Sequence, residues 1–492
     1  MLHGLLHSLA PDLSTGAQAF IRTAYGLFLL GTLLIALPHG RRFFVSERWE
    51  GYAISTPVTD RLQNPTAYPI LMAAWATCGI LLVLGVWSVG AALGNLLLCR
   101  YFFIQMRWKG VLRGMGAPGF LTYWLGGAVF LLEVTTRYAL AARPLAVLVL
   151  QVDFALIILS AGIYKLSAGY PRNEGMEFGL VNPQWGYWWR RWMLLPPSHW
   201  LFRTLNHLAW GTEIAAALCL LLPPTRLWGG LLLIASFAFV ATQIRLGFLC
   251  EMVLVCGVLY FPAGSGPDAW IRLVVPGAGD PALLGSMSIP VVTQLLTATL
   301  WAYMLFLPFA HGGLYYNFYA RRRLPSLWQR ALENYTNFFG MILWRVFTVD
   351  LINFFIRIWR EGREGGGRTL ISDYGFRNGL RYSHVGESIA VTCLFTTLKY
   401  YPSNSPLFLE RLIRYARTVP CSSESALIFE YVSIRKMHDR FTFVPVAEYR
   451  VEPSPGLVTE RVLDPEISVR AAHAVSPVHE GGRPGSYAPL AG

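Results

Sequence analysis

Charged residues are scarce in this sequence. Asp, Glu, Lys and Arg make up 14% of its 492 residues, whereas hydrophobic residues make up 54%, and the mean hydropathy is +0.42. Ordinary soluble domains contain about a quarter charged residues. The shortage of charge therefore excludes a soluble globular protein and predicts a polytopic integral membrane protein.

Motifs of several large enzyme classes are also missing. The chain contains no Walker loop, no HExxH and no GxSxG, and its one GxGxxG, residues 114–119, lies in a basic loop before an apolar run rather than between a strand and a helix. The sequence therefore offers no phosphate-binding loop, zinc-protease helix or nucleophile elbow. Its seven cysteines form no CxxC and show no metal-ligand spacing. We expect neither a disulfide framework nor a metal site.

Long apolar runs are plentiful. A helix needs about 20 apolar residues to cross a hydrocarbon core of about 30 Å. The first run follows a segment with no basic n-region and no cleavage site, so we expect no removable signal peptide. The short breaks at Ser88 and Arg245 leave a count of eight or nine spans open. About nine runs approach the required length: 18–38, 69–87, 88–105, 119–140, 145–164, 204–223, 226–244, 247–262 and 288–311.

Basic residues alternate between the connecting loops. Lys and Arg accumulate in short cytoplasmic loops. Nine spans in a plasma (bacterial inner) membrane, with the N-terminus outside and the C-terminus in the cytoplasm, fit the alternation. The net charge of +13 then belongs to the inner membrane face, and we expect no nucleic-acid partner. The basic loop residues are Arg41, Arg42, Arg48, Arg61, Arg107, Lys109, Arg113, Arg172, Arg190, Arg191, Arg203, Arg321, Arg322 and Arg323.

The chain changes in composition after the transmembrane bundle of residues 1–311. Residues 312–360 mix aromatic and charged residues, which predicts amphipathic helices in the lipid interface. A Gly-rich linker at 361–367 precedes a small soluble α+β domain at 368–451, with one amphipathic helix (LFLERLIRYARTVP) and two strands (ALIFEYVSIRK and DRFTFVPVAEYRV). The Pro- and Gly-rich tail, 452–492, should be extended and disordered unless another membrane-protein subunit binds it.

The composition and the periodicity together give the expected fold class. It is an all-α polytopic membrane protein of about nine transmembrane helices, with interfacial helices and a small α+β cytoplasmic domain at the C-terminus.

An apolar run ends directly on Lys165 in the stretch AGIYKL. One interpretation is chemical: apolar walls desolvate the amine, disfavour its charged form and let it take a proton. The other is topological: the lysine ends a span by extending its ammonium group into the interface. The residues alone leave both interpretations open.

The stretches AGIYKL, NEGMEFG, HLAWGTEIAAALCLLLPPTR and FAFVATQIRLGFLCEMVLV carry a family resemblance. Residues from about 100 to 260 resemble the membrane core of vitamin K-dependent γ-carboxylase and of the broader horizontally transferred transmembrane (HTTM) family. The resemblance implies a helical core that binds a quinone or hydroquinone, with a lysine as the base. Lys165 matches the second of two family lysines, and Tyr164 replaces the first.

The sequence departs from that family at two histidines. Pro118 and Ala238 occupy their positions, and Ala241 replaces an asparagine, whereas Gln243 is retained. The loss of both imidazoles predicts an altered or lost reaction rather than true γ-glutamyl carboxylation. The large luminal domain of the animal enzyme also has no counterpart.

Further polar residues in the apolar runs complete a candidate site. A carboxylate there is unfavourable unless it faces a partner or a cavity, and both remain open for Glu133, Asp153, Glu213 and Glu251. Glu213 also matches an acidic family position. Candidate catalytic residues are Lys165, Glu213 and His207, and candidate ligand-binding residues are Gln243, Arg245, Tyr164 and Glu177.

Three functions remain possible at this point. The first is a divergent HTTM protein that binds a quinone, hydroquinone or membrane lipid around Lys165, and that would use Lys165 as a base if it is an enzyme. The second is a non-catalytic structural or assembly subunit of a larger membrane complex, held in part by the tail. The third, a transporter, lacks a convincing inverted repeat.

Overall fold

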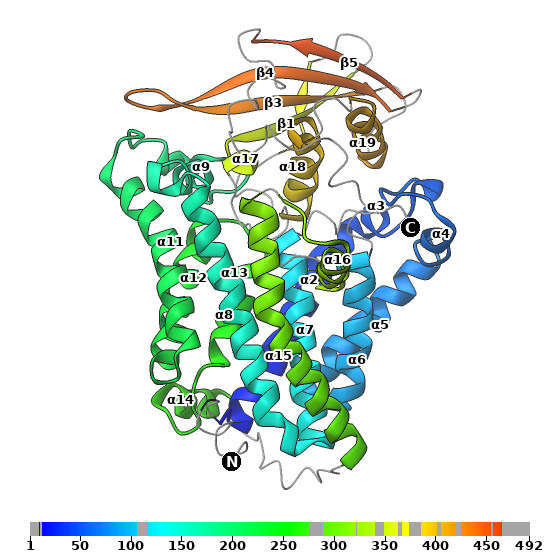
Figure 1. Cartoon of the computed structure of the whole chain (residues 1–492). Coiled ribbons are helices and arrows are strands. Elements are labelled where there is room, and N and C mark those ends of the chain that lie inside the picture. The colour runs from blue at the N-terminus through cyan, green and yellow to red at the C-terminus, as the bar shows by residue number, and fades with distance from the viewer. Residues whose placement is uncertain are drawn as a thin grey trace.

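The protein folds into a long helical bundle with an antiparallel sheet stacked on one end (Figure 1). We call the end of the bundle beneath the sheet the sheet end. The computed structural model describes residues 9, 12–105, 116–275, 289–320, 322–339, 349–362, 367–372, 385–400, 405–419, 425–453 and 456–464.

Most of the bundle consists of long helices that run between its two ends. Six helical stretches among the described residues are long and apolar enough to cross a membrane, which identifies a multi-pass membrane protein. They contain α2 (Thr15–Ala36), α5 (Ala67–Leu84), α7 (Gly116–Tyr138), α8 (Arg143–Ser167), α12 (Arg226–Gln243) and α15 (Pro290–Tyr319).

The expected count of nine spans is not confirmed. Helices α6 (Ser88–Cys99) and α13 (Leu249–Val258) have 12 and 10 residues, or about 18 and 15 Å at 1.5 Å per residue. Helix α11 (Trp200–Leu221) has 22 residues, but its polar residues, Glu213 among them, keep it outside the six stretches. All three nevertheless lie within the bundle (Figure 1).

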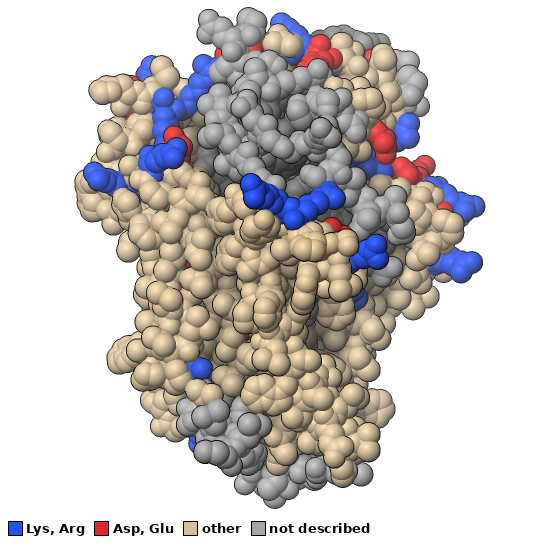
Figure 2. Space-filling model, in the orientation of Figure 1, with Lys and Arg blue, Asp and Glu red and all other residues tan. Residues whose placement is uncertain are grey.

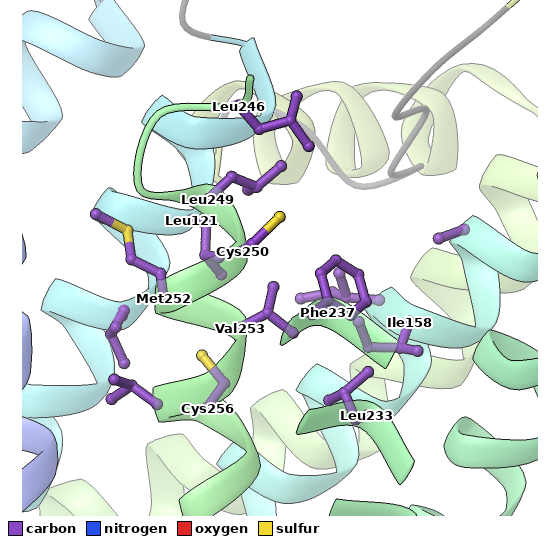
Figure 3. Close-up of a cluster of buried hydrophobic side chains, with 14 of the residues drawn as sticks. Leu121, Ile158, Leu233, Phe237, Leu246, Leu249, Cys250, Met252, Val253 and Cys256 are labelled. Atoms are coloured by element: carbon purple, nitrogen blue, oxygen red, sulfur yellow. The ribbon is translucent and has the colours of Figure 1, made fainter. Parts of the chain in front are cut away.

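The short helix α13 is apolar because protein surrounds it. Cys250, Val253 and Cys256 are each at most 1% exposed and belong to the largest hydrophobic core. Figure 3 shows Val253 facing Phe237 of α12 and Ile158 of α8. An apolar run can therefore mark the centre of a bundle as well as a lipid-facing span.

Shorter helices lie at both ends of the bundle (Figure 1). The amphipathic α16 packs near α15 and α7 and exposes Leu327 and Trp328, as expected of a helix in the lipid interface. The short helices are α3 (Gly40–Phe43), α4 (Pro57–Leu62), α9 (Met176–Val181), α10 (Trp189–Trp192), α14 (Gly266–Val274), α16 (Ser326–Phe339) and α17 (Val349–Ile352).

Within its described residues, the C-terminal domain has a five-stranded antiparallel sheet in the order β2-β1-β3-β4-β5. Helices α18 (Val385–Tyr400) and α19 (Ser405–Thr418) pack on the sheet and form with it a hydrophobic core that is distinct from the largest core of the bundle. The predicted amphipathic helix and both predicted strands are present. The strands are β1 (Phe354–Glu361), β2 (Thr369–Leu370), β3 (Ala426–Lys436), β4 (Phe441–Glu452) and β5 (Leu457–Val462).

Two predicted boundaries of this domain are wrong. Residues 354–360 were expected in an interfacial helix, yet they form β1, which pairs with β3 along its whole length. Residues 457–462 were expected in a disordered tail, yet they form β5 on β4. In both segments cross-strand pairing supplies partners that the local sequence does not reveal. Residues 363–366 of the expected linker and 465–492 of the expected tail lie outside the described residues.

The sheet domain is docked firmly on the bundle by the loop that follows α9. Asn182 donates hydrogen bonds to the carbonyls of Ile352 and Phe354, both at 2.8 Å. Gln184 donates to the Ser388 carbonyl at 2.6 Å. Asn182 and Gln184 are fully buried. These hydrogen bonds therefore lie inside the interface between the bundle and the sheet domain, and the two parts pack directly against each other.

Candidate functional site

The candidate site lies where α8 and α11 approach each other near the sheet end. Gly162 of α8 faces α11 so closely that an added Cβ would stand 2.6 Å from Ile214 Cγ1 and 3.2 Å from the Trp210 carbonyl oxygen. Because glycine has no side chain, the backbones of α8 and α11 can approach each other closely at Gly162. This close approach brings Lys165 to Glu213.

Lys165 and Glu213 form a buried ion pair. The Lys165 ammonium donates a hydrogen bond to Glu213 Oε1, and the two residues are 5% and 6% exposed. A lysine hydrogen-bonded to a carboxylate can act as a base only after its proton has passed to a partner.

Glu213 is only half satisfied by this pair. Its second carboxylate oxygen, Oε2, is buried and has no hydrogen-bond partner among the described residues. Buried carboxylate oxygens are normally hydrogen-bonded, and an unsatisfied one calls for a ligand, a water or a mechanism. The pair therefore leaves one strong acceptor available to a donor from outside the described chain.

A second Lys–Glu pair joins the loop after α8 to the sheet domain. Glu177 of α9 is fully buried and accepts a hydrogen bond from Lys436, the last residue of β3. Asn206 of α11 donates to the other Glu177 oxygen at 2.7 Å and accepts from the Met176 amide at 2.8 Å. Glu177 is thus fully occupied by protein, and the expectation that it binds a ligand is not supported by its contacts.

Tyr170 stands close to both carboxylates. It is fully buried in the turn after α8, and its ring lies 2.7 Å from where a Gly175 Cβ would be. Burial raises the pKa of the Tyr170 phenol, and the negative charges of Glu213 and Glu177 raise it further. Tyr170 is therefore a neutral hydroxyl at physiological pH.

Two predicted site residues face other parts of the bundle. The ring of His207 lies edge-on against Trp210 of the same helix, 5.9 Å between centroids. The ring of Tyr164 packs against Phe318 of α15 at 5.7 Å. Neither of these two ring contacts involves the Lys165–Glu213 pair. Tyr164 is one residue from Lys165, and a step of 100° per residue points it to a different neighbour.

Gln243 and Arg245 support the turn between α12 and α13. Gln243 accepts a hydrogen bond from the Trp192 indole at 3.3 Å and donates to Thr242. Arg245 donates to the Pro183 carbonyl and stacks over the Tyr187 ring at 5.3 Å. These contacts hold the loop after α9 against α12, so both residues are seen in packing roles.

The other membrane carboxylates mainly join helices. Asp153 of α8 accepts hydrogen bonds from Trp124 of α7 and Tyr303 of α15, both at 2.9 Å. Glu133 of α7 accepts from Gln18 of α2 at 3.1 Å and from Ser88 of α6 at 2.5 Å. Of the two interpretations left open for these residues, interhelical hydrogen bonding fits both.

Sequence reasoning missed Asn206, Tyr170 and Lys436. Asn206 precedes Glu213 by seven residues, which puts both on one face of α11, so that spacing was a usable signal. Lys436 offered none, because its contact with Glu177 is formed by residues 259 positions apart.

A surface pocket of about 480 Å³ lies away from these pairs, at the opposite flank of the sheet end, and includes Arg48, Trp49 and Asp60 in its lining. Among the described residues there is no group of three or more His, Cys, Asp or Glu that could hold a metal ion.

No protein-family model, curated protein or solved structure matches the chain. The resemblance of residues 100–260 to the HTTM family and γ-carboxylase therefore remains a prediction.

Proposed function

We propose that this membrane protein binds a lipophilic molecule with a hydroxyl-bearing head, such as a quinol or a membrane lipid, at the Lys165–Glu213 pair. The observation that carries the proposal is the buried Glu213 Oε2, which lacks a hydrogen-bond partner in the described chain. A hydroxyl group donates the hydrogen bond that this oxygen lacks. The neighbouring ammonium favours a ligand oxygen that also carries partial negative charge.

The same geometry weighs against γ-glutamyl carboxylation. The Lys165 amine is bonded to Glu213, and the two family histidines are replaced by Pro118 and Ala238. Proton abstraction by Lys165 would first require the neutral form of both partners. Binding needs no such transfer, and it is the function we assign to the site.

Ligand binding can be tested with a variant that removes both charges. Replacing a buried ion pair by apolar residues of similar size is often neutral for folding, whereas removing one partner leaves a buried charge. We therefore choose the double variant K165M/E213M in full-length protein, reconstituted in phosphatidylcholine nanodiscs and titrated with the short-chain quinol ubiquinol-1.

The double variant should bind ubiquinol-1 at least about tenfold more weakly than the wild type, a loss of about 1.4 kcal/mol. A matched control is D153N, because Asp153 has no ion pair among the described residues and an amide oxygen can still accept from Trp124 and Tyr303. Mass spectrometry of molecules that copurify with the wild type distinguishes a quinol from a lipid. Equal affinity of wild type and double variant would disprove the proposal.

A second function, a structural or assembly subunit, is favoured by the outer edge of the sheet. Among the described strands β5 lies at one edge of the sheet, and its Leu457 and Val462 are 55% and 54% exposed. A strand at a sheet edge with exposed apolar residues can pair with a strand of another chain. Deletion of residues 465–492 and substitution V462K should release a copurifying subunit. An unchanged monomer in both cases would remove this candidate.

We place the protein in a plasma (bacterial inner) membrane with the sheet domain in the cytoplasm and the N-terminus outside. Figure 2 supports this orientation, because Lys and Arg gather around the sheet end of the face in view while the bundle wall below carries few charges. Basic residues favour the cytoplasmic side.

A further inference from the structure

The further inference concerns α15, the helix that covers α8 on the side away from α11. Helix α15 faces lipid over most of its surface, with Leu295, Leu305 and Phe309 each at least 66% exposed. Its buried positions include Leu300, Leu307 and His311. The spacings of seven and four residues place these three on one face of the helix.

That face packs against α8. Leu300 belongs to a hydrophobic cluster with Leu148 and Val149 of α8. Further along, Phe318 packs on Tyr164. His311 lies between these two contacts in the chain, so it occupies a position in the α8–α15 seam that leucine would ordinarily fill.

His311 is nonetheless an unsatisfied imidazole. It is 4% exposed, and neither Nδ1 nor Nε2 has a hydrogen-bond partner among the described residues. One turn further, the Tyr315 hydroxyl is also buried and unpartnered in the same part of the chain. Polar groups without partners are strongly unfavourable at membrane depth. Two of them at a spacing of four residues indicate a binding site.

The surroundings of the two residues favour a flat ligand. The Tyr315 ring is stacked with Tyr319 at 6.2 Å and 22°, and Tyr164 and Phe318 form a further aromatic pair nearby in the seam. Pro308 lies within α15 and has no N–H, so the Met304 carbonyl loses its helical donor and the helix can bend there. This position lies three residues before His311, in a helix that packs against α8.

We infer that His311 and Tyr315 bind a planar lipophilic molecule with a ring carbonyl, of the quinone class, that enters between α8 and α15 from the bilayer. Both the imidazole N–H and the phenol O–H can donate to a carbonyl oxygen. The site is separate from the Lys165–Glu213 pair, because Lys165 contacts α11 whereas His311 belongs to the α15 seam.

The test uses full-length protein carrying K165M/E213M, so that the first site is removed and the two proposals fail independently. The protein in phosphatidylcholine nanodiscs is titrated with ubiquinone-1 by equilibrium dialysis. Four variants are compared in this background: H311L, H311Q, Y315F and the matched control Y316F. Tyr316 is the next residue on α15 and is 41% exposed.

H311L should weaken ubiquinone-1 binding at least about tenfold, equivalent to about 1.4 kcal/mol, and Y315F should weaken it several-fold. H311Q should retain most of the affinity, because an amide still donates, and Y316F should match its parent. H311L should also melt no lower than its parent, because leucine suits the seam. If all four variants bind within about twofold of the parent, the imidazole holds only water and the inference is wrong.

Discussion

Lys436, at the end of β3, donates a hydrogen bond to the buried carboxylate of Glu177 in α9. The contact joins the sheet domain to the loop that follows Lys165. Through Asn206, which bonds Glu177 and lies two turns before Glu213 on α11, it also reaches the helix that carries the candidate site. The position of the sheet domain and the geometry of the Lys165–Glu213 pair are therefore structurally connected.

The Lys436–Glu177 pair should behave as a buried ion pair in mutational tests. K436M leaves the fully buried Glu177 carboxylate without its cation and should destabilise the protein by about 3–5 kcal/mol. The double variant K436M/E177M should recover part of that loss, because the buried charge is gone but Asn206 loses its acceptor. Thermal unfolding of the detergent-solubilised protein measures both effects. A K436M variant as stable as the wild type would contradict the pairing.

The approach of α8 to α11 should depend on Gly162. G162A places a methyl group against Ile214 and the Trp210 carbonyl, which forces the helices apart and should cost about 1–3 kcal/mol. Gly211 of α11 is the matched control, because an added Cβ meets nothing within 4 Å there, and G211A should be neutral or slightly stabilising. The comparison requires melting temperatures of both variants, and equal destabilisation would argue against close packing at Gly162.

Acid should loosen the contact between the sheet domain and the first loop. Burial raises the pKa of Glu387, but the Arg42 charge and hydrogen bonds from Tyr415 and Arg42 outweigh it, so the pKa lies below its ordinary value of 4.5. The unfolded chain then takes up the proton first as the pH falls. The stabilisation is complete above about pH 4.5 and is lost as the pH falls through the lowered pKa.

The measurement is the melting temperature as a function of pH for wild type and E387Q. E387Q should be less stable than the wild type at neutral pH, and its melting temperature should fall less steeply below about pH 4.5. Parallel curves for the two proteins would show that Glu387 does not contribute to the acid response.

The proposed orientation predicts opposite labelling of the two ends. Cys393 of α18 is exposed on the sheet domain, and an impermeant maleimide should label it in inverted vesicles but not in intact cells. A cysteine at position 266 in α14, at the opposite end of the bundle (Figure 1), should show the reverse pattern in a C393S/C421S background. The Cys393 measurement itself uses C421S protein. Labelling of Cys393 in intact cells would show that the sheet domain lies outside the cell and that the proposed orientation is wrong.

Local sequence predicted much of the helical arrangement, and its errors have a common cause. The predicted run 145–164 forms α8, which ends at Ser167, and the other long helices begin and end within four residues of the predicted runs. The exception is α15, which continues from 311 to Tyr319, through residues that were expected in interfacial helices. Hydropathy could not separate a lipid-facing span from the buried helix α13, because both are apolar. It also could not recognise β1 as a strand, because the pairing of Phe355 with Val432 joins distant segments.

The sequence by itself determined that the chain is a helical membrane protein with an amine at the end of α8, because hydropathy and charge are properties of local stretches. Only the tertiary structure decided what that amine and the nearby polar residues do. Lys165 meets Glu213, Glu177 meets Lys436, and His311 meets no described partner. Such outcomes depend on helix rotation and long-range contact, which a residue's neighbours in sequence do not fix.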